Sequence, residues 1–150
     1  MSNRMNKAKP KPIKSLLITH GQLGKELKVI TEKILERRLD METIGILWGE
    51  DGSRILGKIE DFMSRNSGSH IIIFTDMFGG SPSNVCFPFI GPDVEVITGI
   101  NLPGLLKFLT HRNKEIPFQE LVRVIRKGAI EGINVMGEYL GEKSDGRRKS

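Results

Sequence analysis

Residues 71–82 of the chain read IIIFTDMFGGSP. The first five residues are apolar or β-branched and predict a buried strand, which ends at Asp76. Two glycines then precede Ser81 and Pro82, which predict a short helix, because serine caps helix N-termini and proline fits the first helical position. The stretch therefore predicts a strand-to-helix unit of the kind that builds parallel sheets.

The same alternation of strand and helix continues on both sides of this stretch. Further strands are predicted at residues 15–19, 42–48 and 94–98, and apolar side chains spaced by three and four residues predict helices between them. After a last helix over 118–129, Ile133 and Val135 flank a polar residue and predict a short C-terminal edge strand. We therefore expect a single α/β domain, with a mostly parallel sheet in the order 2-1-3-4 and helices on both faces.

Length and charge favour one folded domain with two basic ends. A chain of 150 residues is long enough to bury a single core. The formal net charge is +5; residues 1–14 carry five basic and no acidic side chains, and residues 142–150 carry four basic and two acidic ones, which leaves −2 between them. We expect a basic disordered tail over 1–13, one domain over 14–136 and a polar tail over 137–150. This distribution does not indicate a nucleic-acid-binding face.

Composition argues against several other classes of protein. No apolar stretch approaches the roughly 20 residues of a membrane span, and the N-terminal region lacks a signal-peptide core, so we expect neither membrane insertion nor export. The one cysteine, Cys86, fits a reducing cytoplasm, and we expect it to be buried. Residues 52–58 match the Walker A spacing, but Ile59 replaces the Ser or Thr that binds magnesium, so a buried helix is the preferred interpretation. Metal-ligand spacing and GxGxxG are absent from the sequence, and no cofactor is expected.

His20 directly follows the apolar run Leu16–Ile18 at the end of the first predicted strand. The carboxyl ends of parallel strands meet at one edge of a sheet, and strands one and three are neighbours in the predicted order. We therefore expect His20 to lie beside Asp76. A carboxylate that accepts the Nδ1–H bond would fix the tautomer and leave Nε2 free to attack phosphorus.

Other loops at the same edge offer groups for a phosphoryl ligand. Backbone N–H groups at the helix starts after Gly21 and Gly80, together with the Ser81 hydroxyl, are candidates to bind phosphoryl oxygens. Gly79 and Asn101 complete the predicted phosphoryl-binding loops, and Asn101 also suits a helix cap. Each residue has a purely structural interpretation as well, as a surface histidine, a turn-capping aspartate or a turn glycine. Their convergence on one edge favours a functional site.

Three stretches around these loops carry a resemblance to a known family. They are ITHG at 18–21, DMFGGSP at 76–82 with Asn84, and VITGINLP at 96–103. Their order and spacing, over about residues 14–136, resemble the IIA component of the mannose-type bacterial sugar phosphotransferase system. The chain departs from the family pattern at Gly104, where methionine is common, and at Pro88, which interrupts a usually smoother helix.

The resemblance implies a flavodoxin-like fold and a cytoplasmic phosphotransferase component. It implies that His20 accepts a phosphoryl group from the histidine-containing phosphocarrier protein and passes it to a IIB partner in sugar uptake. It also implies that Asp76 orients His20, that Ser81 lies in the loop lining the site, and that the chain forms a homodimer through an edge strand at Ile133 to Met136.

Other functions remain open at this point. A stand-alone regulatory module, whose phosphohistidine state controls a protein interaction, fits a solitary domain with unusual tails. A flavin or nucleotide binder at the same edge is less favoured, because no phosphate-loop or dinucleotide motif is present. An aspartate-phosphorylated receiver is disfavoured, because that chemistry needs acidic residues after the first strand, where Thr19 and His20 stand.

Overall fold

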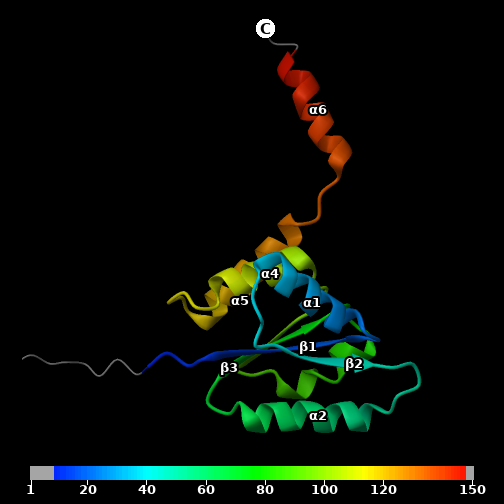
Figure 1. Cartoon of the computed structure of the whole chain (residues 1–150), viewed down its shortest axis with the longest axis vertical. Coiled ribbons are helices and arrows are strands. Elements are labelled where there is room, and N and C mark those ends of the chain that lie inside the picture. The colour runs from blue at the N-terminus through cyan, green and yellow to red at the C-terminus, as the bar shows by residue number, and fades with distance from the viewer. Residues whose placement is uncertain (1–8, 148–150) are drawn as a thin grey trace, which may run out of the picture.

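Four parallel strands form one sheet in this structure, a computed structural model that describes residues 9–147 (Figure 1). The strands are β1 (Ile13–His20), β2 (Glu42–Ile46), β3 (His70–Thr75) and β4 (Val94–Ile97). Their order is β2-β1-β3-β4, and each neighbouring pair is parallel. The predicted α/β class and strand order are thus confirmed, and the order is that of flavodoxin-like sheets. The second strand is two residues shorter than predicted.

Helices cover both faces of this sheet (Figure 1). One face carries α1 (Leu23–Leu35), α4 (Leu102–His111) and α5 (Phe118–Glu131). The other carries α2 (Gly52–Arg65), the short α3 (Ser81–Asn84) and the 3-10 turn η1 (Phe87–Phe89). The Walker-like stretch lies within α2, where Ile55, Ile59 and Phe62 are buried, so the interpretation as a buried helix is confirmed.

The middle of β1 explains why both faces need helices. Leu16, Leu17 and Ile18 have no exposed surface. Leu17 belongs to the apolar cluster under α1, α4 and α5, whereas Leu16 and Ile18 belong to the cluster against α2. Successive side chains of a strand point to opposite faces, so a continuous apolar run can be buried only between two layers of helices.

The predicted C-terminal edge strand is wrong for the part of the chain that the structure describes. Ile133 and Val135 lie in an irregular loop, with side chains 75% and 60% exposed, between α5 and α6 (Met136–Arg147). Two apolar residues with one polar residue between them are too short a pattern to fix a strand without a partner strand beside them. Helix α6 extends away from the sheet and its helices (Figure 1).

The two predicted tails are only partly within the described residues. Residues 137–147 of the predicted polar C-terminal tail belong to helix α6. Residues 1–8 and 148–150, the outer parts of both predicted tails, lie outside the described residues.

The turn after β3 forms nearly as predicted. Gly80, rather than Ser81, is the N-cap of α3, and Ser81 is its first residue. The helix ends at Asn84, and Pro88 lies in the separate turn η1. Cys86 is fully buried, as expected, and burial raises the pKa of its thiol to about 11, so it acts as a small apolar side chain.

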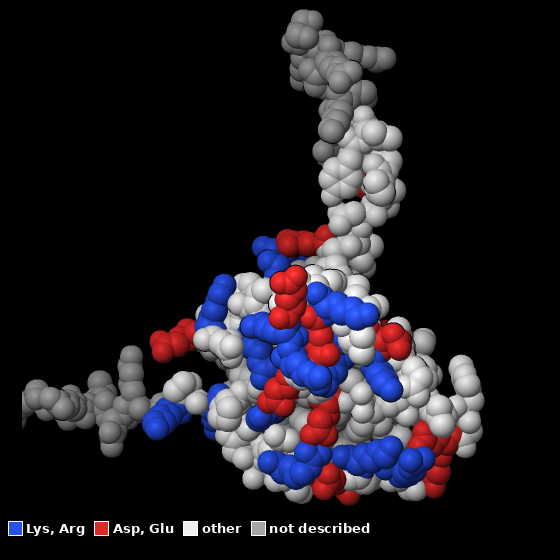
Figure 2. Space-filling view, in the orientation of Figure 1, with Lys and Arg blue, Asp and Glu red and all other residues white. Residues whose placement is uncertain are grey.

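Both signs of charge occur on the surface. Figure 2 shows acidic side chains among the lysines and arginines of the viewed face. At α2, for example, the Arg65 guanidinium donates to both carboxylate oxygens of Glu42, at 2.6 and 3.0 Å, and to Asp61 at 2.9 Å. Within residues 9–147, no helix combines the length and apolar character needed to cross a membrane.

Candidate functional site

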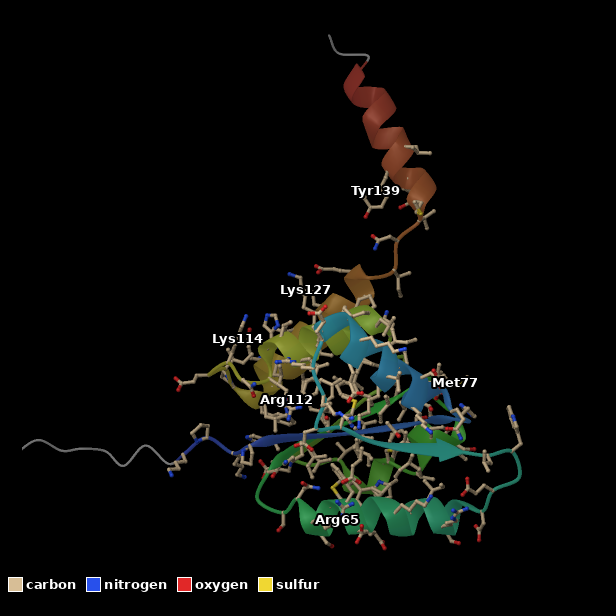
Figure 3. The ribbon with its side chains drawn as sticks, viewed as in Figure 1. Arg65, Met77, Arg112, Lys114, Lys127 and Tyr139 are labelled. Carbon is tan, nitrogen blue, oxygen red and sulfur yellow. The ribbon has the colours of Figure 1, made fainter. Side chains whose placement is uncertain are left out.

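His20 and Asp76 meet at the carboxyl edge of the sheet. His20 ends β1, and Asp76 follows the last residue of the neighbouring strand β3. The Nδ1 atom of His20 lies 2.8 Å from Oδ2 of Asp76, and the backbone N–H of His20 donates to the same oxygen at 2.9 Å. Asp76 Oδ1 accepts the N–H of Met77 at 3.0 Å, and Met77 is labelled at this edge in Figure 3. The structure therefore brings the two central predicted residues together.

The hydrogen bonds to Asp76 keep its carboxyl group ionised. Burial raises the pKa of Asp76, since only 11% of its side chain is exposed, but the hydrogen bonds from the backbone and ring of His20 outweigh burial and hold that pKa below its ordinary value. An ionised carboxylate can only accept hydrogen bonds. The neutral imidazole must therefore carry its proton on Nδ1, which leaves the lone pair on Nε2.

Gly80 lies against the other side of the imidazole ring. A Cβ atom at this position would be 2.9 Å from Cε1 of His20 and 3.5 Å from Nε2. The first distance is shorter than real side chains tolerate, so any other residue would displace the ring. The His20 side chain remains 30% exposed, so the ring is held in place without being closed off from solvent.

Two residues that sequence reasoning missed hold the loop after β1. The Thr19 hydroxyl accepts the N–H of Gly24 at 2.7 Å and ties the strand to the first turn of α1. A Cβ atom on Gly45 would overlap the carbonyl oxygen of Gly21. The available signal was a glycine inside the second predicted strand, because such glycines often mark a close backbone approach.

Three predicted phosphoryl-binding residues already use their polar groups within the protein. The Gly21 N–H donates to Ile46 O at 2.8 Å, and the Gly79 N–H donates to Ser83 Oγ at 2.9 Å. Asn101 caps α4, as predicted, by accepting the Gly104 N–H at 2.9 Å, and its amide donates to the Ala129 carbonyl at 2.9 Å. The structure thus gives these residues roles in building the loops.

Gly80 and Ser81 differ from those three. Gly80 lies so close to the ring that a Cβ atom would meet it, and the exposed Ser81 has no hydrogen-bond partner for its hydroxyl among the described residues. They are the predicted loop residues that best fit a direct role beside His20.

Trp48 is a further neighbour that the sequence analysis did not assign to the site. Its ring centroid lies 5.8 Å from that of His20. The signal was present, because the predicted second strand, 42–48, ends at Trp48, and β2, which ends two residues before Trp48, neighbours β1. Aromatic residues at the carboxyl ends of adjacent parallel strands are close in space.

His20 is partly exposed at the carboxyl edge of the sheet, with 30% of its side chain accessible. A concavity of about 520 Å³ lies at the opposite edge, against His70, Arg112 and Phe118, where His70 stacks on Phe118 at 4.4 Å. Arg112 and Lys114 are labelled on that side in Figure 3. Among residues 9–147, no group of three or more His, Cys, Asp or Glu side chains is arranged to hold a metal ion.

The chain is similar to a family model and to several known proteins. The model of the family described as "PTS system fructose IIA component" matches residues 14–126. The chain is 26% identical over 129 residues to the mannose-specific EIIAB component of Escherichia coli K12, covering 84% of this chain and 40% of that protein. It is 24% identical over 131 residues to the fructose-specific EIIA component of Bacillus subtilis, covering 85% of this chain and 89% of that protein.

Solved structures show the same fold. The phosphotransferase system component EIIA of Streptococcus agalactiae superposes with a TM-score of 0.76 at 22% identity, over 84% of this chain and 98% of that one. The mannose/sorbose-specific IIA subunit of Enterococcus faecalis gives 0.74 at 20% identity, over 83% and 94%.

The matched region contains the sheet, apart from Ile13 at the start of β1, and the His20–Asp76 pair. The chain spans about 40% of the length of the E. coli relative, which carries both A and B parts in its name. Because the family model covers most of the chain, the chain belongs to the family of IIA components of the phosphotransferase system (PTS).

Proposed function

We propose that Nε2 of His20 carries a phosphoryl group between proteins. The observation that carries the proposal is the 2.8 Å contact between Nδ1 and the ionised Asp76 carboxylate. In the accepting step, the Nε2 lone pair attacks the phosphorus of a donor phosphohistidine. The new N–P bond forms as the donor's N–P bond breaks, and that electron pair returns to the donor nitrogen. Asp76 stabilises the positive charge that builds on the ring.

The donor and recipient in this proposal are both proteins. We assign the donor role to the histidine-containing phosphocarrier protein and the recipient role to a IIB component in sugar uptake. Membership in the PTS IIA family supports both assignments, and the exposed edge around His20 suits docking of another protein. The proposal includes a cytoplasmic location, which the single unpaired cysteine supports.

Phosphorylation by a reconstituted donor chain tests the proposal. The protein is incubated with phosphoenolpyruvate, enzyme I and the histidine carrier, and the intact mass is recorded before and after acid treatment. We expect one acid-labile phosphoryl group, located by peptide fragmentation on His20. A reaction without enzyme I is the control. Absence of incorporation, or incorporation on another residue, would contradict the proposal.

Gly80→Ala is expected to slow phosphorylation roughly 10- to 100-fold. The added methyl group should displace the imidazole, and misplacing a reacting group by about 1 Å can cost about 100-fold in rate. The added methyl group would push on Cε1 of His20 from 2.9 Å. Gly57→Ala is the matched control, because a Cβ there meets no atom within 4 Å. Initial rates of label uptake measure the effect, and equal rates for both variants would show that Gly80 does not control the ring position.

We also propose that the chain forms a homodimer through residues 130–140. Large apolar side chains along this stretch are more than half exposed: Ile130, Ile133, Val135, Met136, Tyr139 and Leu140. A contiguous apolar stretch of this size favours association, and a second copy is the partner that the PTS IIA resemblance implies.

Val135→Asp is expected to convert that dimer to monomer at micromolar protein concentration, because a charge would be buried in the apolar interface. Ile34→Asp is the matched control, because Ile34 is exposed to a similar degree on α1, outside residues 130–140. Sedimentation velocity reads out the mass. A wild-type monomer, or a dimer that resists Val135→Asp, would contradict this interface.

A further inference from the structure

Trp48 is the most exposed large apolar side chain beside the proposed phosphorylation site. Its side chain is 93% exposed, and it is the one tryptophan of the chain. Its ring is tilted by 33° to the His20 ring at a centroid distance of 5.8 Å. Tryptophan usually buries much of its large surface, so an exposed one next to a nucleophile calls for an explanation.

The loop after β2 is built to hold Trp48 outward. Gly49 adopts a positive φ of 78°, and the N–H of Glu50 donates to the Leu47 carbonyl at 3.1 Å. The Glu50 side chain is only 9% exposed; it accepts the Leu47 N–H at 2.9 Å and pairs with Arg54 at 2.8 Å. These contacts close a tight turn on either side of Trp48. The indole is therefore presented at the edge by an ordered loop, with the His20 ring as its neighbour.

Trp48 is the aromatic side chain paired with the His20 ring in the described structure. Asp76 occupies the Nδ1 end, and Gly80 lies against Cε1 and Nε2 without any side chain. Because Gly80 has no side chain, a phosphoryl group on Nε2 would be open to water unless another side chain covered it. The indole lies beside the imidazole but is itself almost fully exposed, so it is near enough to turn over a phosphoryl group on Nε2 and limit the approach of water.

We propose that Trp48 covers the phosphorylated imidazole of His20 and protects it from hydrolysis until the recipient protein docks. This inference rests on the proposed function. In the hydrolysis it opposes, a water oxygen attacks phosphorus, the N–P bond breaks, and its electron pair returns to Nε2, giving inorganic phosphate and free His20. An indole excludes water without offering a competing nucleophile, so it slows this loss while leaving transfer to a docked histidine or cysteine open.

The lifetime of the isolated phosphoprotein tests the inference. Wild type, Trp48→Phe, Trp48→Ala and Phe87→Ala are phosphorylated, freed of donor and followed by phosphorus NMR. We expect Trp48→Ala to shorten the half-life by about 3- to 10-fold, the scale of one aromatic contact, and Trp48→Phe to stay near wild type. Phe87→Ala removes a half-exposed aromatic ring with no ring contact to His20 in the described structure, and should change nothing.

Tryptophan fluorescence supplies a second readout. Because Trp48 is the one tryptophan, its emission should change when wild type is phosphorylated. Phosphorylation of every variant with equal half-lives and no emission change would overturn the role of Trp48 while leaving the proposed function intact. If Trp48→Ala takes up the phosphoryl group more slowly but its phosphorylated form has the wild-type half-life, the protective role would also be overturned. Trp48 would then act by contacting the donor protein. Failure of wild type to take up phosphate would instead reject the proposed function.

Discussion

The His20→Gln variant is expected to take up no phosphoryl group from the donor chain, a loss of at least about a thousandfold in rate. A glutamine amide has no basic nitrogen lone pair, so nothing in the variant can replace Nε2 as the nucleophile. The fold should persist, because the backbone N–H of His20 still donates to Asp76 and the core residues Leu16 to Ile18 of β1 are unchanged. Intact mass after incubation with donors measures the loss.

His111→Gln is the matched control for this experiment. His111 ends α4 and contacts its own helix, with Nδ1 2.9 Å from the Lys107 carbonyl oxygen. The His111→Gln variant should be phosphorylated on His20 at the wild-type rate. Circular dichroism and thermal unfolding confirm that both variants fold. Phosphate uptake by His20→Gln would mean that the nucleophile is another residue, and the assignment of His20 would have to be abandoned.

The sheet and its central residue pair could be predicted because they depend on local patterns. The apolar runs that became β1 and β3 are buried on both faces, which gives a signal independent of distant contacts. Once those strands are parallel neighbours, the positions of His20 and Asp76 follow from where each run stops. The 2.8 Å contact between their side chains confirms that inference.

The loop roles could not be predicted, because hydrogen-bond partners far apart in sequence leave no local pattern. The Asn101 amide binds the carbonyl of Ala129, 28 residues away, and so serves the contact between α4 and α5. Gly21 gives its N–H to Ile46 on the next strand. A glycine or asparagine suits both a ligand loop and such internal bonding, and only the folded chain distinguishes the two.

The prediction of a C-terminal edge strand was wrong for a related reason. A strand is stable only beside a partner, and residues 133–135 have none within the described chain. Their apolar side chains remain exposed in the described chain, and the proposed dimer would bury them. The alternation in the sequence was therefore too short to determine the secondary structure of this segment.

The Asp76→Asn variant is expected to accept phosphate roughly 10²- to 10⁴-fold more slowly than wild type, because the charge that stabilises the developing imidazolium is lost. Asp76 Oδ2 accepts two bonds from His20, and Oδ1 accepts the Met77 N–H. The asparagine amide has one oxygen, which can accept either from His20 or from the Met77 N–H. Its NH₂ group then faces the remaining donor and cannot accept that hydrogen bond. Asp51→Asn is the matched control, since it removes an exposed carboxylate that caps α2. Initial rates of label uptake measure the difference.

Stability against pH gives a second, independent test of Asp76. The pKa of Asp76 is held below its ordinary value in the folded protein, so its ionised form adds stability that is fully present above the unfolded pKa of about 3.9. That stability is lost as the pH falls through the lowered folded pKa. Asparagine does not titrate, so Asp76→Asn should be less stable than wild type at neutral pH, and the difference should shrink below about pH 4. Urea unfolding at both pH values measures it. A difference that stays constant with pH would mean that the His20–Asp76 pair does not depend on the carboxylate charge, and the orienting role of Asp76 would fail with it.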